Sequence, residues 1–188
     1  MSRRKGGKFV DYKRIESLAE SVLSQFGYKG DGAIEIVELA QKEGFVVGEA
    51  VLENDSDGMI LVNTNVESIL GHETQKIILV NRDLDGYFKR FVIAHELGHY
   101  FLDDGKKTQN YILAHRDPKV RMDDDHEKEM DYFAACLLMP VEPFKRVCDV
   151  GKALFQNDNE SMELISLLSN FFKVPKRSVE RRLKEVAG

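Results

Sequence analysis

Residues 91–102 read Phe-Val-Ile-Ala-His-Glu-Leu-Gly-His-Tyr-Phe-Leu, and this stretch decides how the 188-residue chain is organised. Apolar residues surround the motif His95-Glu-Leu-Gly-His99 at three- and four-residue spacings, which predicts a helix from about Gly86 to residue 102. His95 and His99 lie one turn apart on the same face, so both imidazoles can reach one tetrahedral metal ion. The stretch therefore predicts a helix that carries two metal ligands.

Glu96 follows the first of these histidines and lies about 100° round the helix from it. From there its carboxylate reaches a metal-bound water without entering the coordination sphere. A metal would lower the pKa of that water toward about 7 and polarise a scissile carbonyl, while Glu96 moves the proton to the leaving amine. The motif predicts a hydrolase of a peptide-like bond. The alternative is that the histidines lie on the exposed face of an amphipathic helix.

A catalytic zinc usually takes three protein ligands, so a further residue must come from elsewhere in the chain. Residues 126–131 read His-Glu-Lys-Glu-Met-Asp and fall in the next predicted helix, where Glu127 and Asp131 share the apolar face. We assign Glu127 as the third ligand and Asp131 as the carboxylate that holds the free N–H of a ligating histidine, His95. The alternative is that the acidic run 123–129 only complements the positive end of a helix dipole.

A donor for the tetrahedral oxyanion should lie nearby. Residues 103–123 mix charge, glycine and proline without periodicity, which predicts a long functional loop. Its candidates for oxyanion or substrate contacts are Tyr111, His115 and Arg116, and the sequence does not choose among them.

The remaining pattern predicts an α+β fold in which a small antiparallel or mixed sheet packs on helices. The first two β-rich stretches are expected to form a hairpin, and the third, 76–81, is a candidate to pair with an extended substrate strand. The helices are expected at 11–27, 32–43, 124–139, 141–149, 161–172 and 175–186, and the β-rich stretches at 45–52, 59–63 and 76–81.

Composition bounds the class of protein. No apolar run approaches the roughly 20 residues that span a bilayer, and no apolar signal peptide follows Met1, so a cytoplasmic protein with no membrane partner is expected. Net charge of −5 argues against a surface devoted to nucleic acid, and direct nucleic-acid binding is not expected. The two cysteines, Cys136 and Cys148, show no metal-binding spacing and are expected to be buried thiols.

Three parts are expected along the chain: a disordered basic tail at 1–10, a metallopeptidase domain at 11–150 and a C-terminal helical pair at 151–188. This pair has the size of a helix-turn-helix, but two short helices that cap a core look the same in sequence. We favour the capping role. Its basic residues are Lys173, Lys176, Arg177, Arg181, Arg182 and Lys184.

Residues 91–102, together with 127–140, resemble the two motifs of the ImmA/IrrE-type metallopeptidases of bacteria and mobile elements. Residues 15–45 resemble the leading helices of that family. The resemblance implies a thermolysin-like zincin core with one Zn²⁺ per chain. It also implies the ligands His95, His99 and Glu127 and the catalytic residue Glu96.

Three positions depart from the pattern of that family. Met130 stands where alanine is usual, Asp131 where asparagine is usual, and Asp103 where a histidine often follows the helix. The resemblance implies a regulatory protease that cuts a helix-turn-helix repressor and so acts in transcription regulation. The alternative is a DNA-binding or interaction regulator whose metal site is structural or vestigial.

Overall fold

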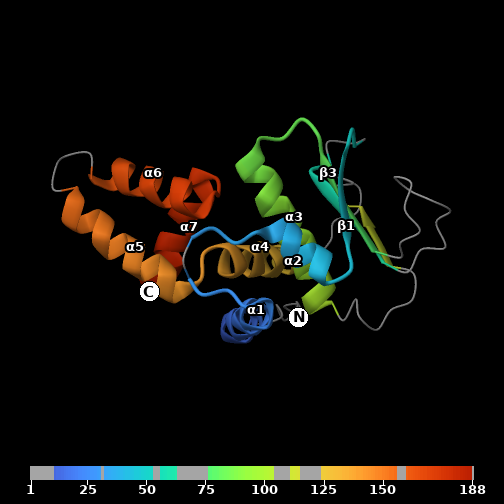
Figure 1. Cartoon of the computed structure of the whole chain (residues 1–188), viewed down its shortest axis with the longest axis horizontal. Coiled ribbons are helices and arrows are strands. Elements are labelled where there is room, and N and C mark those ends of the chain that lie inside the picture. The colour runs from blue at the N-terminus through green and yellow to red at the C-terminus, as the bar shows by residue number, and fades with distance from the viewer. Residues whose placement is uncertain are drawn as a thin grey trace, which may run out of the picture.

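A computed structural model describes residues 11–30, 32–52, 56–62, 76–103, 111–114, 124–155 and 160–187. Within these ranges the chain forms seven helices and a four-stranded sheet (Figure 1), which confirms the α+β class. The predicted tail, residues 1–10, lies outside them. The elements are α1 (Tyr12–Phe26), α2 (Ile36–Lys42), β1 (Val46–Ala50), β2 (Gly58–Val62), β3 (Lys76–Asn81), α3 (Gly86–Leu102), β4 (Tyr111–Ala114), α4 (Asp124–Leu138), α5 (Val141–Leu154), α6 (Glu160–Phe172) and α7 (Lys176–Ala187).

The sheet has the strand order β1-β3-β2-β4. Strand β3 runs parallel to β1, with Val46 opposite Ile77, and antiparallel to β2, with Ile60 opposite Ile78. The predicted hairpin between the first two strands is therefore wrong, because β1 and β2 lie on opposite sides of β3. Ile77, Ile78 and Val80 are all buried, and a strand that is apolar on both faces belongs in the centre of a sheet.

Two further expectations for the sheet are wrong. Strand β3 cannot pair with a substrate strand, since both of its edges are already paired. Residues 111–114, expected in a loop, form β4 and pair antiparallel with β2. A strand of four residues carries too little alternation to be recognised from sequence, and its pairing with a distant strand decides its structure.

The helices agree with the predicted positions except at two ends. Helix α2 begins at Ile36 rather than residue 32, after a turn in which the Ile36 amide donates to the Ile34 carbonyl. Helix α5 continues to Leu154, beyond the expected end at residue 149. Its last turns pack closely on α6, because a Cβ at Gly151 would lie 2.5 Å from Leu164 Cδ1. Tertiary packing thus extends a helix that local sequence alone would end earlier.

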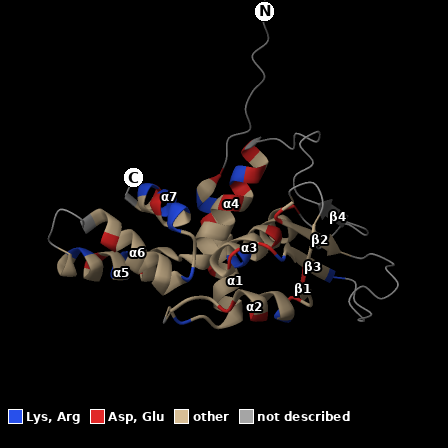
Figure 2. Ribbon diagram, turned by 90° about the horizontal axis from the view of Figure 1, so that it is seen from above, with Lys and Arg blue, Asp and Glu red and all other residues tan. Residues whose placement is uncertain are grey.

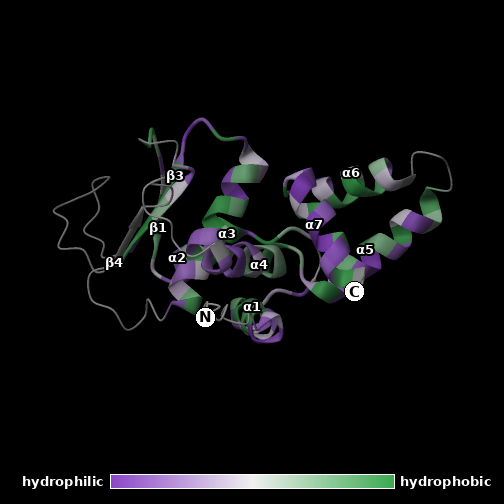
Figure 3. Ribbon diagram, turned by 180° about the vertical axis from the view of Figure 1, so that it is seen from behind, coloured by the Kyte–Doolittle hydropathy of each residue, from purple (hydrophilic) through white to green (hydrophobic). Residues whose placement is uncertain are grey.

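Helix α3 lies between the sheet and α4, and α1 packs on α4 from another side. Figure 3 shows hydrophobic residues along the strands and on α3 beside them, whereas α7 is mainly hydrophilic. Leu97 of α3 and Phe133 of α4 are fully buried. The free thiols of Cys136 and Cys148 are buried, as expected. No helix among the described residues is long and apolar enough to cross a membrane.

The C-terminal helices pack on the core. Arg182 of α7 is fully buried, and its Nε donates to the Met139 carbonyl at 3.1 Å. The guanidinium of Arg177 lies 4.5 Å from the centre of the Phe88 ring on α3. The predicted division into three parts stays a prediction, and its boundary at residue 150 falls inside α5.

Candidate metal centre

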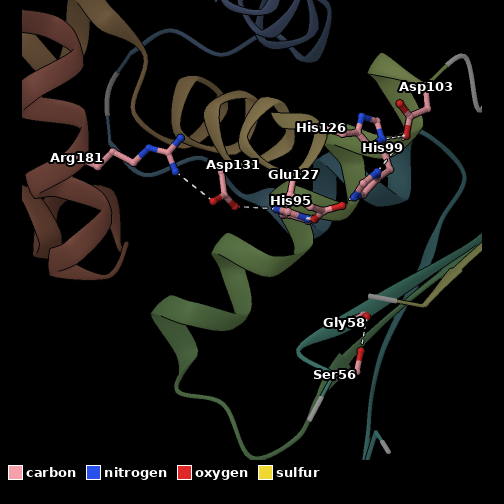
Figure 4. Close-up of polar contacts among 9 residues, drawn as sticks. All are labelled: Ser56, Gly58, His95, His99, Asp103, His126, Glu127, Asp131 and Arg181. Atoms are coloured by element: carbon pink, nitrogen blue, oxygen red, sulfur yellow. Dashed lines mark hydrogen bonds and ion pairs between the residues drawn. The ribbon is translucent and has the colours of Figure 1, made fainter. Parts of the chain in front are cut away.

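Helix α3 presents the two histidines of the motif. The helix begins after Asp85, whose carboxylate accepts hydrogen bonds from the amides of Tyr87 and Phe88 at 2.9 and 3.1 Å. The cap satisfies amides that have no partner within the helix and fixes where it starts. Further along, the Nε2 atoms of His95 and His99 lie 3.3 Å apart, each ring pointing to the same place (Figure 4).

Helix α4 brings Glu127 to the same place. Its Oε2 lies 3.2 Å from His95 Nε2, and ligand atoms of His95, His99 and Glu127 all lie within 4.8 Å of one another. Zinc bound tetrahedrally at 2.0–2.1 Å holds its ligand atoms about 3.3 Å apart. The separations therefore fit a single zinc ion, and the donor set of two imidazoles and one carboxylate suits that metal.

The close crossing of α3 and α4 depends on Gly98. A Cβ at this position would lie 3.2 Å from Met130 Sδ and 3.3 Å from Met130 Cα. Because the second contact is with backbone, a side chain at Gly98 would push the helices apart. Met130 itself is fully buried at the crossing. The absence of a side chain at Gly98 allows α4 to approach until Glu127 reaches the histidines.

Glu96 is buried beside this cluster. Burial raises the pKa of its carboxyl to about 8, the charge of His95 opposes this rise, and that of Glu127 adds to it. Among the described residues Glu96 Oε2 has no hydrogen-bond partner. Strand β2 covers the carboxylate with Gly58, where a Cβ would lie 3.1 Å from Glu96 Oε1. A buried oxygen without a donor fits a site that takes in water or a metal ion.

His95 contacts a carboxylate with its other ring nitrogen. Asp131 Oδ1 lies 3.0 Å from His95 Nδ1, which is the contact expected from the sequence. Because a carboxylate only accepts, Nδ1 carries the proton, and Nε2 is the nitrogen that can bind a metal once it is deprotonated. The other oxygen of Asp131 lies 3.1 Å from Arg181 Nη1, which comes from α7.

His99 has a similar arrangement at the other end of the site. Asp103 Oδ2 lies 3.0 Å from His99 Nδ1 and 3.1 Å from His126 Nε2. His99, Asp103 and His126 also form a group whose ligand atoms lie within 4.8 Å of one another. A metal in this second group would need His99 Nδ1 without its proton. Donation from His99 Nδ1 to Asp103 leaves Nε2 for the first group, so we interpret the second as hydrogen bonds.

The pKa values of the two histidines move in opposite directions. Burial opposes charge on His95, but hydrogen bonds to Asp131 and Glu127 outweigh it and raise the pKa to about 10. Burial lowers the pKa of His99, and the hydrogen bond to Asp103 does not compensate. Burial also opposes ionisation of Asp131, but its hydrogen bond to His95 prevails and lowers its pKa. In the metal-free chain a proton on His95 Nε2 therefore lies where a metal would bind.

The structure brings together His95, Glu96, His99, Glu127 and Asp131. Of the candidates for oxyanion contacts, His115 and Arg116 lie outside the described residues, and Tyr111 is described only as the first residue of β4. Sequence reasoning gave no role in the site to three residues that contact it. Two of these have a local signal, since Asp103 lies four residues after His99 and His126 precedes Glu127. The third, Arg181, has none.

A helix with H-E-x-x-H beside a carboxylate of the next helix is typical of metallopeptidases. Residues 54–184 match the IrrE N-terminal-like domain, a peptidase family, and the chain belongs to this family. A search of curated proteins gave no significant match.

Eleven chains of solved structures match significantly. One is a Mycobacterium tuberculosis transcriptional regulator, with a TM-score of 0.59 and 21% sequence identity. The match covers 91% of this chain and 46% of that one, so the chain spans less than half the length of the regulator. At this identity the likeness shows a shared fold.

Proposed function

We propose that the chain is a zinc-dependent endopeptidase that regulates transcription by cutting a helix-turn-helix repressor. One observation carries the proposal: atoms of His95, His99 and Glu127 meet at tetrahedral spacing beside the buried carboxylate of Glu96. Membership of a peptidase family supports the hydrolytic reaction. The transcriptional regulator of similar fold supports the regulatory role.

In this proposal His95, His99 and Glu127 hold one zinc ion per chain. Zinc supplies a Lewis acid for a water molecule and the scissile carbonyl. Glu96 takes a proton from the water and donates it to the leaving nitrogen. The raised pKa of Glu96 belongs to the metal-free chain, and a nearby cation favours the carboxylate form that a general base requires. Asp131 and Asp103 hold the two rings in orientation.

The alternative is a DNA-binding regulator that uses the basic residues of the C-terminal helices. The contacts of these residues count against it. Arg182 is buried, Arg181 contacts Asp131 and Arg177 lies over the ring of Phe88. Lys173 lies 4.0 Å from Glu35. Four of the six basic residues therefore contact other parts of the same chain, although Lys173 and Arg177 stay exposed, and these contacts reduce the charge available to a phosphate backbone.

The test is metal content and peptidase activity of the wild type beside Glu96→Gln and Glu127→Ala. The substrate is a helix-turn-helix repressor encoded next to the gene. Glu96→Gln should keep near-stoichiometric zinc and lose about 10²- to 10⁴-fold in cleavage rate, since a general base contributes that much. Glu127→Ala should lose zinc. The matched control is Glu129→Ala on the same helix, a carboxylate outside both ligand groups.

Two results would contradict the proposal. Cleavage that persists in Glu96→Gln would exclude Glu96 as the base. A wild-type protein that binds no metal would favour the alternative, the DNA-binding regulator. A salt-dependent mobility shift of operator DNA would test that alternative. Lys176→Gln with Lys184→Gln, both exposed on α7, would reduce that shift if the regulator hypothesis holds.

A further inference from the structure

We propose that Arg181 is a positioning residue of the metal centre, which acts on His95 through the carboxylate of Asp131. The C-terminal helix α7 would then complete the site rather than merely cover the core. This inference rests on the proposed function, since it concerns the metal ligands of that function.

The carboxylate of Asp131 is held from two sides. Its Oδ1 lies 3.0 Å from His95 Nδ1, and its Oδ2 lies 3.1 Å from Arg181 Nη1. Contacts on both oxygens fix the plane of the carboxylate, so that Oδ1 stays directed at the ring of His95. Figure 4 shows this line of side chains running from α7 through Asp131 to His95. An orienting carboxylate that is itself held restricts the ring more than one free to rotate.

Arg181 is held in place by its own helix. Its Nε donates to Glu185 Oε1 at 2.9 Å, one turn further along α7. Arg182, the next residue, anchors the helix from the buried side, with Nε on the Met139 carbonyl and Nη2 3.4 Å from Glu16 Oε1. Figure 2 shows the basic residues of α7 beside the charged residues of α4. The two adjacent arginines therefore share Glu185 and differ in their other partners, which is Asp131 for Arg181 and Met139 with Glu16 for Arg182.

Electrostatics alone predicts the opposite effect from positioning. The Arg181 guanidinium is a positive charge near a cation site, so its removal should strengthen metal binding by Coulomb's law. Arg181 is 40% exposed, and solvent screens this repulsion. A loss of metal affinity in a folded Arg181→Gln variant therefore points to the lost orientation of Asp131 and His95 and not to the lost charge. The sign of the change distinguishes the two effects.

The experiment measures the zinc dissociation constant of the full chain by competition with a chromophoric chelator. Arg181→Gln should raise this constant a few-fold, less than the roughly ten-fold cost of losing the carboxylate that contacts the ligand itself. Arg181→Lys should recover part of the loss, because lysine keeps one donor for Asp131. The matched control is Lys184→Gln, which removes the same charge from an exposed position on α7 and should change the constant by less than about two-fold.

A double-mutant cycle with Asp131→Asn decides whether the effect passes through Asp131. In the Asp131→Asn background, Arg181→Gln should change the zinc dissociation constant by less than about two-fold, since the ion pair is already gone. An equal loss in both backgrounds, or tighter zinc binding in Arg181→Gln, would overturn the inference. If Arg181→Gln does not fold, the same cycle with Arg181→Lys decides.

Failure of the inference is distinguishable from failure of the proposed function. Wild-type protein that binds zinc but cleaves no repressor would refute the proposed activity and leave the role of Arg181 intact. Zinc affinity that is the same in every variant, with active wild type, would refute only the role of Arg181. A wild type that binds no zinc would refute both.

Discussion

The two ends of the candidate metal centre are held in different ways. At one end, His95 contacts Asp131, which contacts Arg181 on a third helix, α7. The side chain of Asp131 is 37% exposed and that of Arg181 is 40% exposed. At the other end, His99 contacts Asp103, the C-cap residue of α3, and Asp103 contacts His126 of α4. There His99 is fully buried, and its partners are 20% and 25% exposed.

This difference in surroundings shifts the pKa values of the two histidines in opposite directions. Hydrogen bonds to two carboxylates raise the pKa of His95 to about 10, whereas burial lowers the pKa of His99. Under the proposed function, a metal ion would therefore compete with a proton at His95 more than at His99. The two ends of the site would then differ in how strongly metal binding depends on pH.

The largest expected effect concerns pH and the stability of the metal-free chain. The pKa of His95 rises from 6.5 to about 10 and that of Glu96 from 4.5 to about 8. In both cases the folded chain keeps a proton that the unfolded chain releases, so these two groups make stability fall as pH rises, whereas the lowered pKa of His99 opposes the fall below about pH 6.5. Asp131, whose pKa is lowered, titrates below this range.

The free energy of unfolding of the metal-free chain should therefore fall by on the order of a few kcal/mol between pH 5 and about 10. Urea denaturation at several pH values measures it. Glu96→Gln should remove the fall below about pH 6.5 and leave the part between about 6.5 and 10 that His95 contributes. Saturating zinc should reverse the trend, because the metal favours deprotonated ligands. A flat profile would mean that neither His95 nor Glu96 holds an extra proton in the folded chain.

The next effect separates the two ends by zinc affinity. Asp103→Ala should raise the zinc dissociation constant by about 10- to 100-fold, because His99 is fully buried and the position that Asp103 leaves is less accessible to water than that of Asp131. Asp131→Ala should have a smaller effect, about ten-fold or less, since water reaches the more exposed His95 end. Chelator competition measures both constants. The reverse order would show that the His95 end is the rigid one.

A substitution between the ends should affect both. Gly98→Ala places a Cβ against Met130 Cα and should lower the free energy of unfolding by about 1 kcal/mol, because overpacking outweighs the better helix propensity of alanine. Zinc binding should weaken a few-fold, since Glu127 moves away from the histidines. Thermal unfolding with and without zinc measures this. A stabilised variant with unchanged zinc affinity would show that the helices tolerate the extra methyl group.

The smallest expected effect is a difference in salt dependence. The ion pair of Arg181 with Asp131 is partly exposed, so the loss of zinc affinity in Arg181→Gln should shrink by a few tenths of a kcal/mol at about 1 M salt. The loss in Asp103→Ala should stay the same within error, because its partners are more buried. Chelator competition at two salt concentrations tests this. Equal salt dependence at both ends would remove the distinction between them.

The helical part of this molecule could be predicted because its signals are local. Periodicity placed α3 and α4 correctly, and helical geometry alone put Glu127 and Asp131 on the face that meets His95. The roles of these residues as ligands and supports stay predictions. Asp103 could also have been found, because a residue four positions after His99 lies on the same helical face.

Long-range pairing could not be predicted in the same way. The position of β3 between β1 and β2, and the existence of β4, depend on contacts between strands far apart in sequence. Arg181 meets Asp131 across 50 residues, and nothing in the pattern of α7 distinguishes it from its exposed neighbour Lys184. Such contacts follow from how whole helices pack.

Strand β4, the last in the strand order, lies between His99 and Glu127 in the sequence. This position has a consequence for variation among related chains. A metal bound to both residues closes the intervening segment into a loop. Closure entropy grows only logarithmically with length, by about 0.6 kcal/mol for each doubling. Under the proposed function, insertions or deletions in this segment would therefore change the free energy of metal binding little, and β4 could diverge among related chains while the ligands are kept.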